Sequence, residues 1–247
     1  MPTVEELTAI YENFMLAPRH GPGVCRRCLN LTAGYDRCYA CDHMPSLLAA
    51  VVPISYSVAG EQLHHALAGY KRRSGAAARR LELGIAAVLW RFLARHEGCV
   101  ARAAGVASFP VVTIVPSSNR SREGEQRLRA IVGELVMPTR QRFQAVLQRS
   151  EAEADRHEFN AEKYQALRPF EGEPVLLIDD TWTTGANAQS AAAALLAAGS
   201  GPVAAVAVGR HVNRRWRAND EALRALPAPF DWTNCVVCSA AALRQAA

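Results

Sequence analysis

The sequence lacks the features that mark several common classes of protein. No export signal opens it, and the stretch closest to a transmembrane helix, residues 189–208, carries no charge but is interrupted by a Gly-Ser-Gly-Pro turn, so it is predicted to form a helix, a turn and a strand. Aromatic residues form only 7% of the chain and do not alternate with basic ones, which argues against a groove that stacks nucleic-acid bases. We therefore expect a soluble, cytoplasmic protein with no membrane insertion.

Composition sets the size of the protein and the sign of its charge. The chain has 247 residues, half of them hydrophobic, which suits one large α/β domain with a small appendage. Its formal net charge of +5 fits an anionic ligand such as a polyphosphate and a weak attraction to nucleic acid, but it is also ordinary for soluble proteins. Charge alone therefore selects no function.

Apolar runs and helical periodicity predict an α/β fold. Buried strands are indicated over residues 111–115, 174–178 and 203–208, and helices over 1–17, 76–96, 123–136 and 186–198. This alternation favours a parallel sheet flanked by helices. Residues 139–170 are weakly patterned and compatible with irregular strands, a helix near 141–155 and a loop. We place a domain boundary after residue 54, with a helix and a cysteine-containing segment over 1–54 and the main domain over 55–247.

The strongest functional signal follows the second predicted strand. Asp179 and Asp180 end that strand, at the edge where open α/β sheets bind ligands. The next loop is rich in threonine, contains Gly185 and leads into a helix, whose N-terminus attracts anions. Two carboxylates beside a phosphate site are explained if they accept hydrogen bonds from vicinal ribose hydroxyls. The alternative, an ordinary turn capped by Asp and Thr, explains each residue but not the whole string.

Residues 175–187 resemble the phosphoribosyl pyrophosphate motif of type I phosphoribosyltransferases. The resemblance implies the type I phosphoribosyltransferase fold. It also implies that Asp179 and Asp180 are the catalytic pair and bind the ribose 2- and 3-hydroxyls. The resemblance further implies that the next residues bind the substrate around its 5-phosphate, namely Thr181, Trp182, Thr183, Thr184, Gly185, Ala186 and Asn187. Asn187 stands where the family often has Thr, and it can still donate a hydrogen bond. Trp182 is bulky for this loop and could instead shape the acceptor site.

The pyrophosphate of such a donor needs a second binding loop, and Mg²⁺ usually lies between its oxygens. In the resembling family this loop follows an early strand, which here places it at Ser117, Ser118, Asn119 and Arg120. Backbone N–H groups, hydroxyls and a guanidinium all bind phosphate. A plain turn with solvated arginines has the same composition and is the alternative.

Six of the seven cysteines form Cys-x-x-Cys pairs. Two of these pairs, Cys25/Cys28 and Cys38/Cys41, are separated by nine residues, a spacing that predicts a four-thiolate Zn²⁺ site. Nearby arginines would offset its negative charge, namely Arg26, Arg27 and Arg37. A redox dithiol sits at a helix N-terminus after a strand, which neither pair does, and free thiols are the remaining alternative.

A cysteine knuckle ahead of a phosphoribosyl domain resembles the ComF family, which is linked to DNA uptake in bacterial competence. The resemblance extends to a predicted helix that ends in Lys71 and to the strand at 111–115, and in order it covers most of residues 25–210. It implies structural Zn²⁺ and adds Lys71 to the substrate-binding residues. ComF-like chains usually continue the second loop with Arg-Gly-Phe-Asn-Gln. Here residues 122–126 read Arg-Glu-Gly-Glu-Gln, which leaves pyrophosphate binding less well supported than phosphoribosyl binding.

The third cysteine pair is open to several interpretations. Cys235 and Cys238 are compatible with a second metal half-site, with a position near the first knuckle, or with packed free thiols. Cys99 stands alone, and the seven histidines show no metal-binding spacing.

Two functions of different classes fit these observations. One is a transferase that binds 5-phosphoribosyl 1-pyrophosphate with Mg²⁺ and transfers the phosphoribosyl group to an acceptor that the sequence does not identify, with release of pyrophosphate. The other is a non-catalytic, ComF-like accessory or sensor protein, with single-stranded DNA or DNA-uptake proteins as partners. Turnover of the donor separates the two. A homodimer is usual among the resembling enzymes.

Overall fold

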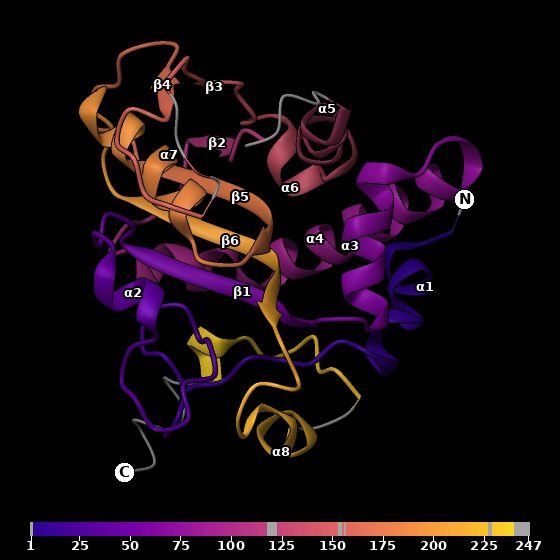
Figure 1. Ribbon diagram of the computed structural model, residues 1–247. Coiled ribbons are helices and arrows are strands. Elements are labelled where there is room, and N and C mark those ends of the chain that lie inside the picture. Colours follow the sequence, from indigo (N-terminus) through magenta and orange to yellow (C-terminus); the bar gives the residue numbers. More distant parts are fainter. Residues whose placement is uncertain (1, 118–122, 153–154, 156, 227–228, 240–247) are drawn as a thin grey trace.

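A parallel sheet forms the centre of the computed structural model, which describes the chain except residues 1, 118–122, 153–154, 156, 227–228 and 240–247 (Figure 1). The sheet contains strands β1 (Ala50–Val58), β6 (Val203–Val212), β5 (Val175–Trp182) and β2 (Val111–Ile114), in the order β1-β6-β5-β2. All three neighbouring pairs are parallel. The predicted α/β architecture with a parallel sheet and flanking helices is therefore confirmed.

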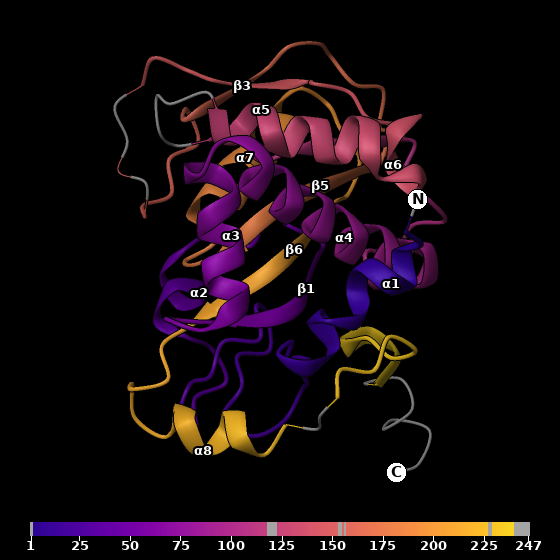
Figure 2. The same cartoon turned by 90° about the vertical axis from the view of Figure 1, so that its right-hand side faces the viewer.

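Helices cover both faces of this sheet (Figures 1 and 2). One face carries α3 (Gln62–Arg72), α4 (Gly75–Ala103), α5 (Glu123–Ala130), a π-helical turn (Ile131–Leu135) and α6 (Met137–Arg140), with α1 (Val4–Ala9) and a 3₁₀ turn (Tyr11–Asn13) packed outside α4. The other face carries α7 (Ala186–Ala197), α2 (Tyr39–His43) and the antiparallel hairpin β3 (Leu147–Arg149) and β4 (Tyr164–Ala166). A short helix, α8 (Asn219–Arg224), follows β6.

Strand β5 shows why buried strands could be predicted from apolar runs in the sequence. Leu176 and Ile178 pack into the core on the α4 side, whereas Val175 and Leu177 pack into the core on the α7 side. All four side chains are fully buried. A strand that is buried on both faces has no polar alternation, so it appears in the sequence as a continuous apolar run.

Strand β1 was not predicted, and it crosses the predicted boundary after residue 54. Its sequence contains Pro53, Ser55 and Ser57, which interrupt the apolar run. Proline is tolerated because β1 is an edge strand, which pairs with β6 on one side and meets only the short bridge of Leu16 to Tyr56 on the other side among the described residues. The segment before the boundary therefore supplies part of the central sheet.

Two helical expectations need correction. The N-terminal helix is shorter than residues 1–17, because α1 ends at Ala9 and a 3₁₀ turn follows it. A helix near 141–155 does not form in the described residues of that range, where β3 begins at Leu147. Among the residues that the structure describes, no helix combines the length and apolar character needed to span a bilayer.

Helix α4 approaches the N-terminal segment closely at Gly84. A Cβ at this position would lie 2.2 Å from the Tyr11 hydroxyl oxygen, whereas a Cβ at Gly98 of the same helix would meet nothing within 4 Å. We predict that Gly84→Ala lowers the free energy of unfolding by about 1–3 kcal/mol through overpacking. Gly98→Ala should raise it by about 0.5–1 kcal/mol, because alanine is the better helix former. Urea denaturation measures both, and equal stabilisation by the two variants would contradict the close approach.

Candidate functional site

The loop between β5 and α7 is shaped by one glycine and one tryptophan. Gly185 precedes α7 with a φ of 87°, a conformation that L side chains rarely adopt. A Cβ there would lie 2.2 Å from Cζ2 of Trp182, whose ring therefore packs directly beneath the loop. The Thr184 hydroxyl accepts a hydrogen bond from the Ala186 N–H at 3.2 Å and so caps the first turn of α7. Gly185 and Trp182 thus fix a tight turn, and the backbone amides of this turn lie just before the N-terminus of α7.

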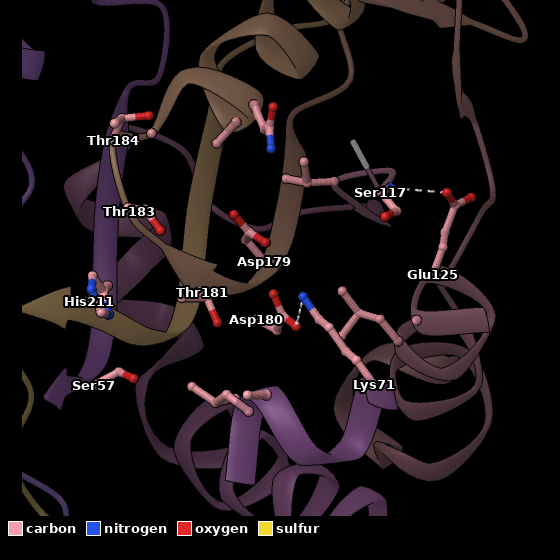
Figure 3. A pocket seen from close by; sticks show the side chains of 18 of the residues that line it. Ser57, Lys71, Ser117, Glu125, Asp179, Asp180, Thr181, Thr183, Thr184 and His211 are labelled. Atoms are coloured by element: carbon pink, nitrogen blue, oxygen red, sulfur yellow. Dashed lines mark hydrogen bonds and ion pairs between the residues drawn. The ribbon is translucent and has the colours of Figure 1, made fainter. Parts of the chain in front are cut away.

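This loop lines a pocket of about 500 Å³ at the carboxyl ends of the strands. Most of the predicted site residues come together here, namely Lys71, Ser117, Asp179, Asp180, Thr181, Thr183, Thr184, Gly185, Ala186 and Asn187. In Figure 3, Thr183 and Thr184 lie on one side of the two aspartates, and Ser117 lies on the other side. Ser118, Asn119 and Arg120 fall outside the described residues. The pocket therefore joins the predicted phosphate loop to the start of the predicted pyrophosphate loop.

Asp180 is held by two residues of α3. Its Oδ2 accepts a hydrogen bond from the Tyr70 hydroxyl at 2.5 Å and forms an ion pair with Lys71 Nζ at 2.5 Å. Burial and the charge of Asp180 raise the pKa of Tyr70 well above its usual value, so the phenol keeps its proton. Burial opposes the charge of Lys71, but the attraction to Asp180 prevails and raises the pKa of the ammonium. Both groups remain donors to Asp180 at neutral pH.

Asp179 faces the same pocket without such a close ion pair. Burial and the neighbouring charge of Asp180 raise its pKa to about 7, and Lys71 opposes this rise. Above pH 7 the Asp179 carboxyl is ionised beside the ion pair of Asp180 and Lys71. Such a surface favours ligands that bring hydroxyl donors or a divalent cation.

A carboxylate occupies the opposite wall of the pocket. Glu125 Oε2 accepts the backbone N–H of Ser117 at 3.0 Å, and its Oε1 accepts a hydrogen bond from Arg129 at 2.6 Å (Figure 3). Glu125 belongs to the string at which the chain departs from the resembling family. The Ser117 amide at the start of the predicted pyrophosphate loop is therefore bound by a carboxylate of the chain.

Trp182 takes a different position from the other predicted binding residues. Its side chain is 1% exposed and packs in the same core as Cys25, Cys28, Cys38 and Cys41. It is not among the residues that line the pocket. Trp182 therefore supports the loop and does not line the pocket, because its ring packs against Gly185.

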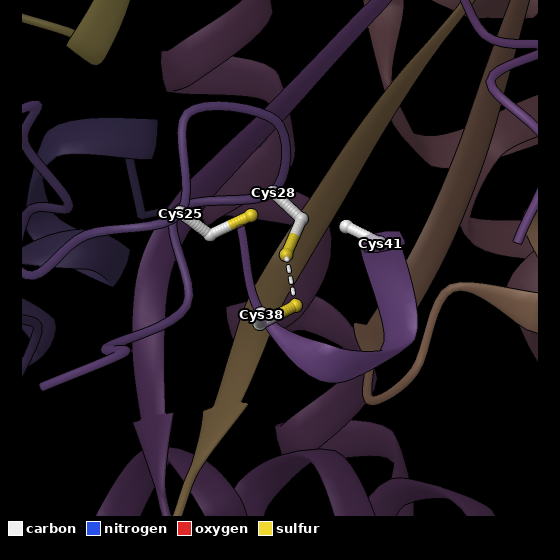
Figure 4. Close-up of side chains that lie close together, drawn as sticks. All are labelled: Cys25, Cys28, Cys38 and Cys41. Atoms are coloured by element: carbon white, nitrogen blue, oxygen red, sulfur yellow. Dashed lines mark hydrogen bonds between the residues drawn. The ribbon is translucent and has the colours of Figure 1, made fainter. Parts of the chain in front are cut away.

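The two N-terminal cysteine pairs form one buried cluster. The four Sγ atoms of Cys25, Cys28, Cys38 and Cys41 lie within 4.8 Å of one another, and Cys28 and Cys38 are 3.6 Å apart (Figure 4). A tetrahedron with Zn–S bonds of 2.3 Å has edges of about 3.8 Å, which matches this spacing. The cysteine cluster is thus compatible with structural zinc, as the spacing predicted.

A buried arginine joins the cysteine cluster to the β5–α7 loop. Arg210 Nη2 lies 3.6 Å from Cys28 Sγ, while its Nη1 donates to the carbonyl oxygens of Trp182 and Thr183 at 3.1 and 2.9 Å. Its Nε donates to the Cys28 carbonyl at 3.2 Å. Arg26, expected to offset the cluster charge, instead pairs with Asp36 at the surface.

Sequence reasoning missed Arg210, Tyr70 and Glu125, although each contacts a predicted site residue. Arg210 is 182 residues from Cys28, and Tyr70 is 110 residues from Asp180, so no local spacing connects them. Glu125 was noted only as a departure from the family string. Comparison of the sequence with models of protein families gave no match, and comparison with curated proteins gave none either.

We predict that Arg210→Lys loosens the cysteine cluster and the β5–α7 loop together. Lysine cannot reach all these acceptors, and each buried carbonyl left without a donor costs about 1–3 kcal/mol. The free energy of unfolding should fall by about 2–4 kcal/mol, and a chelator should remove zinc faster. The matched control is Arg214→Lys, since Arg214 is partly exposed and pairs with Glu61 and Asp220. It should cost about 1 kcal/mol or less. Equal, small effects of both variants would contradict the role of Arg210.

Proposed function

We propose that the protein binds 5-phosphoribosyl 1-pyrophosphate with Mg²⁺ in this pocket and transfers the phosphoribosyl group to an acceptor with release of pyrophosphate. One observation carries the proposal. Two adjacent aspartates at the end of a parallel strand share a pocket with a threonine-rich loop that opens a helix. This arrangement supports the resemblance of residues 175–187 to type I phosphoribosyltransferases.

The 5-phosphate fits the β5–α7 loop. Thr183, Thr184 and Asn187 line the pocket beside the N-terminus of α7, where amide groups and the helix dipole favour an anion. The Asn187 Oδ1 is buried without a partner among the described residues, so this oxygen can accept a hydrogen bond from a ligand hydroxyl or a water. Donors to the phosphate would come from the backbone amides of the loop and from the hydroxyls of Thr183 and Thr184.

The ribose hydroxyls fit the two aspartates. Both donors to Asp180 use its Oδ2, and within the described part of the chain its Oδ1 has no partner. Asp180 can thus accept a sugar hydroxyl while Tyr70 and Lys71 stay in place. The ionised Asp179 lies beside it and accepts the second hydroxyl.

Pyrophosphate would lie towards Ser117 and Lys71, on the other side of the aspartates. Mg²⁺ would be held through pyrophosphate oxygens and the aspartate side of the pocket, and when bound it neutralises charge on the leaving group. Lys71 Nζ is a further cation at this end of the pocket. The Lys71 ammonium would orient the leaving group, and the Ser117 amide would do so only after it is released from Glu125.

A non-catalytic accessory or sensor role is favoured by one specific observation. Glu125 holds the Ser117 amide and places a negative charge where the pyrophosphate would bind. A ComF-like protein that recognises the ribose phosphate without transferring it could keep such a residue. Release of pyrophosphate from the donor, measured with nitrogen-containing acceptors, separates the two functions.

The proposed ligand should bind saturably in calorimetric titration with Mg²⁺ at pH 8, where Asp179 is ionised. In the double variant Asp179→Asn/Asp180→Asn we expect the affinity to fall at least about 100-fold, since two charge-assisted hydrogen bonds are lost. Asp220→Asn, which changes an aspartate outside the pocket, should leave the affinity unchanged. Absence of binding by folded wild-type protein would refute the proposal, and equal loss in both variants would place the site elsewhere.

Removing the carboxylate of Glu125 should strengthen pyrophosphate binding. Glu125→Ala removes the carboxylate that holds the Ser117 amide and deletes a like charge, so we expect the affinity for Mg²⁺-pyrophosphate to rise about 10-fold, or about 1.4 kcal/mol. Glu134→Ala, in the following π-helical turn and away from the pocket, is the control and should change nothing. Unchanged or weaker binding by Glu125→Ala would show that the Ser117 loop does not receive the pyrophosphate.

A further inference from the structure

Four metal-binding side chains meet at the end of α4, far from the cysteine cluster in sequence. His96 and Cys99 lie on α4, and Cys235 and Cys238 lie near the end of the described chain. Their donor atoms lie within 4.8 Å of one another. Cys99 Sγ and Cys235 Sγ are 3.2 and 3.3 Å from Cys238 Sγ. The expectation that Cys99 stands alone is therefore corrected.

The histidine of this group is oriented as a metal ligand. His96 Nε2 lies 2.9 Å from the backbone carbonyl oxygen of Trp232, an acceptor that requires the proton on Nε2. Nδ1 is then unprotonated, and it lies 3.6 Å from Cys238 Sγ and 4.0 Å from Cys99 Sγ. Metal-bound histidines usually donate their second ring N–H in this way, and the bond fixes the tautomer that binds the ion.

We propose that His96, Cys99, Cys235 and Cys238 bind one Zn²⁺ as a second, His-Cys₃ site. Tetrahedral zinc with bonds of about 2.0 Å to nitrogen and 2.3 Å to sulfur has ligand–ligand distances of about 3.5–3.8 Å. Four of the six donor–donor distances are 3.2–4.0 Å, on both sides of that range, and all six lie within 4.8 Å. Three of the four residues are buried, as in a closed structural site.

The surrounding charge also suits a zinc thiolate. Three thiolates and one Zn²⁺ carry a net charge of about −1. Arg102 Nη2 lies 3.5 Å from Cys99 Sγ and supplies one compensating positive charge. Three uncharged thiols would give this guanidinium no anionic partner in the cluster.

The ion would close a junction between the two ends of the chain. The Trp232 indole N–H donates to Glu12 Oε1 at 2.9 Å, and the Phe230 N–H donates to the Glu12 carbonyl at 2.9 Å. Arg91 of α4 pairs with Glu12 at 2.8 Å and stacks over the Trp232 ring. A zinc ion bound by Cys235 and Cys238 anchors this C-terminal segment on α4, and through Glu12 it steadies the N-terminal segment.

The test is the zinc content of the full chain, purified without chelator and measured by elemental analysis. We expect two zinc ions per chain. Cys235→Ser/Cys238→Ser should keep one ion, and so should Cys25→Ser/Cys28→Ser, because each double variant destroys a different site. Wild-type protein with one ion that Cys235→Ser/Cys238→Ser retains would overturn the second site but leave the first intact.

Single substitutions of His96 keep the test valid if a double variant fails to fold. His96→Ala should lose one zinc ion, whereas His96→Cys should retain both, because cysteine restores a fourth ligand. A simple packing role of the imidazole predicts no such difference. All seven cysteines should react with a thiol reagent after denaturation with chelator and without reductant. Loss of two reactive thiols would show a disulfide and overturn the proposal.

Discussion

The hydrogen bonds of the Arg210 guanidinium hold together the cysteine cluster and the β5–α7 loop, and the arrangement of the candidate site depends on them. Arg210 is 2% exposed, and the acceptors around it are four backbone carbonyls and the sulfur of Cys28. A buried cation needs an anionic partner, because desolvation costs several kcal/mol. Four thiolates around a Zn²⁺ ion would carry a net charge of about −2 and would supply that partner. The cysteine cluster is therefore part of the site's support, since the same guanidinium holds the carbonyls of Trp182 and Thr183.

Cysteine-based clusters occur where the chain cannot build a core of its own. Residues 21–45 contain few periodic apolar residues, and the segment after α8 is short. Each segment nevertheless packs against the main body, the first beside β6 through Cys28 and Arg210, the second against α4 through Trp232. Metal ligation concentrates binding energy in a few side chains, so it suits segments with little apolar surface. With metal bound as proposed, the same chemistry would fasten both segments to the main body.

The sequence predicted what is local and missed what is formed through space. Strands β2, β5 and β6 were predicted because burial on both faces makes them apolar runs, and the two aspartates with their loop form one contiguous string. Strand β1 was missed because Pro53 and two serines hide it, although an edge position tolerates them. The partners of Asp180 on α3, and those of the Cys235/Cys238 pair on α4, lie more than 100 residues away in the chain. His96 and Cys99, three residues apart on one helix face, were the local signal for the second cluster.

The two adjacent aspartates lower the stability of the protein at neutral pH. A carboxyl whose folded-state pKa is about 7, raised by burial and by Asp180, is destabilising once it ionises. The cost is absent below the ordinary carboxyl pKa of about 4, grows between pH 4 and 7, and is complete above 7. Tyr70 and Lys71 offset the charge of Asp180, so the unfavourable ionisation falls on Asp179. A ligand that donates a hydroxyl hydrogen bond to Asp179 would offset this cost. The free energy that the ionised Asp179 costs the unbound protein would then add to the binding free energy of the ligand.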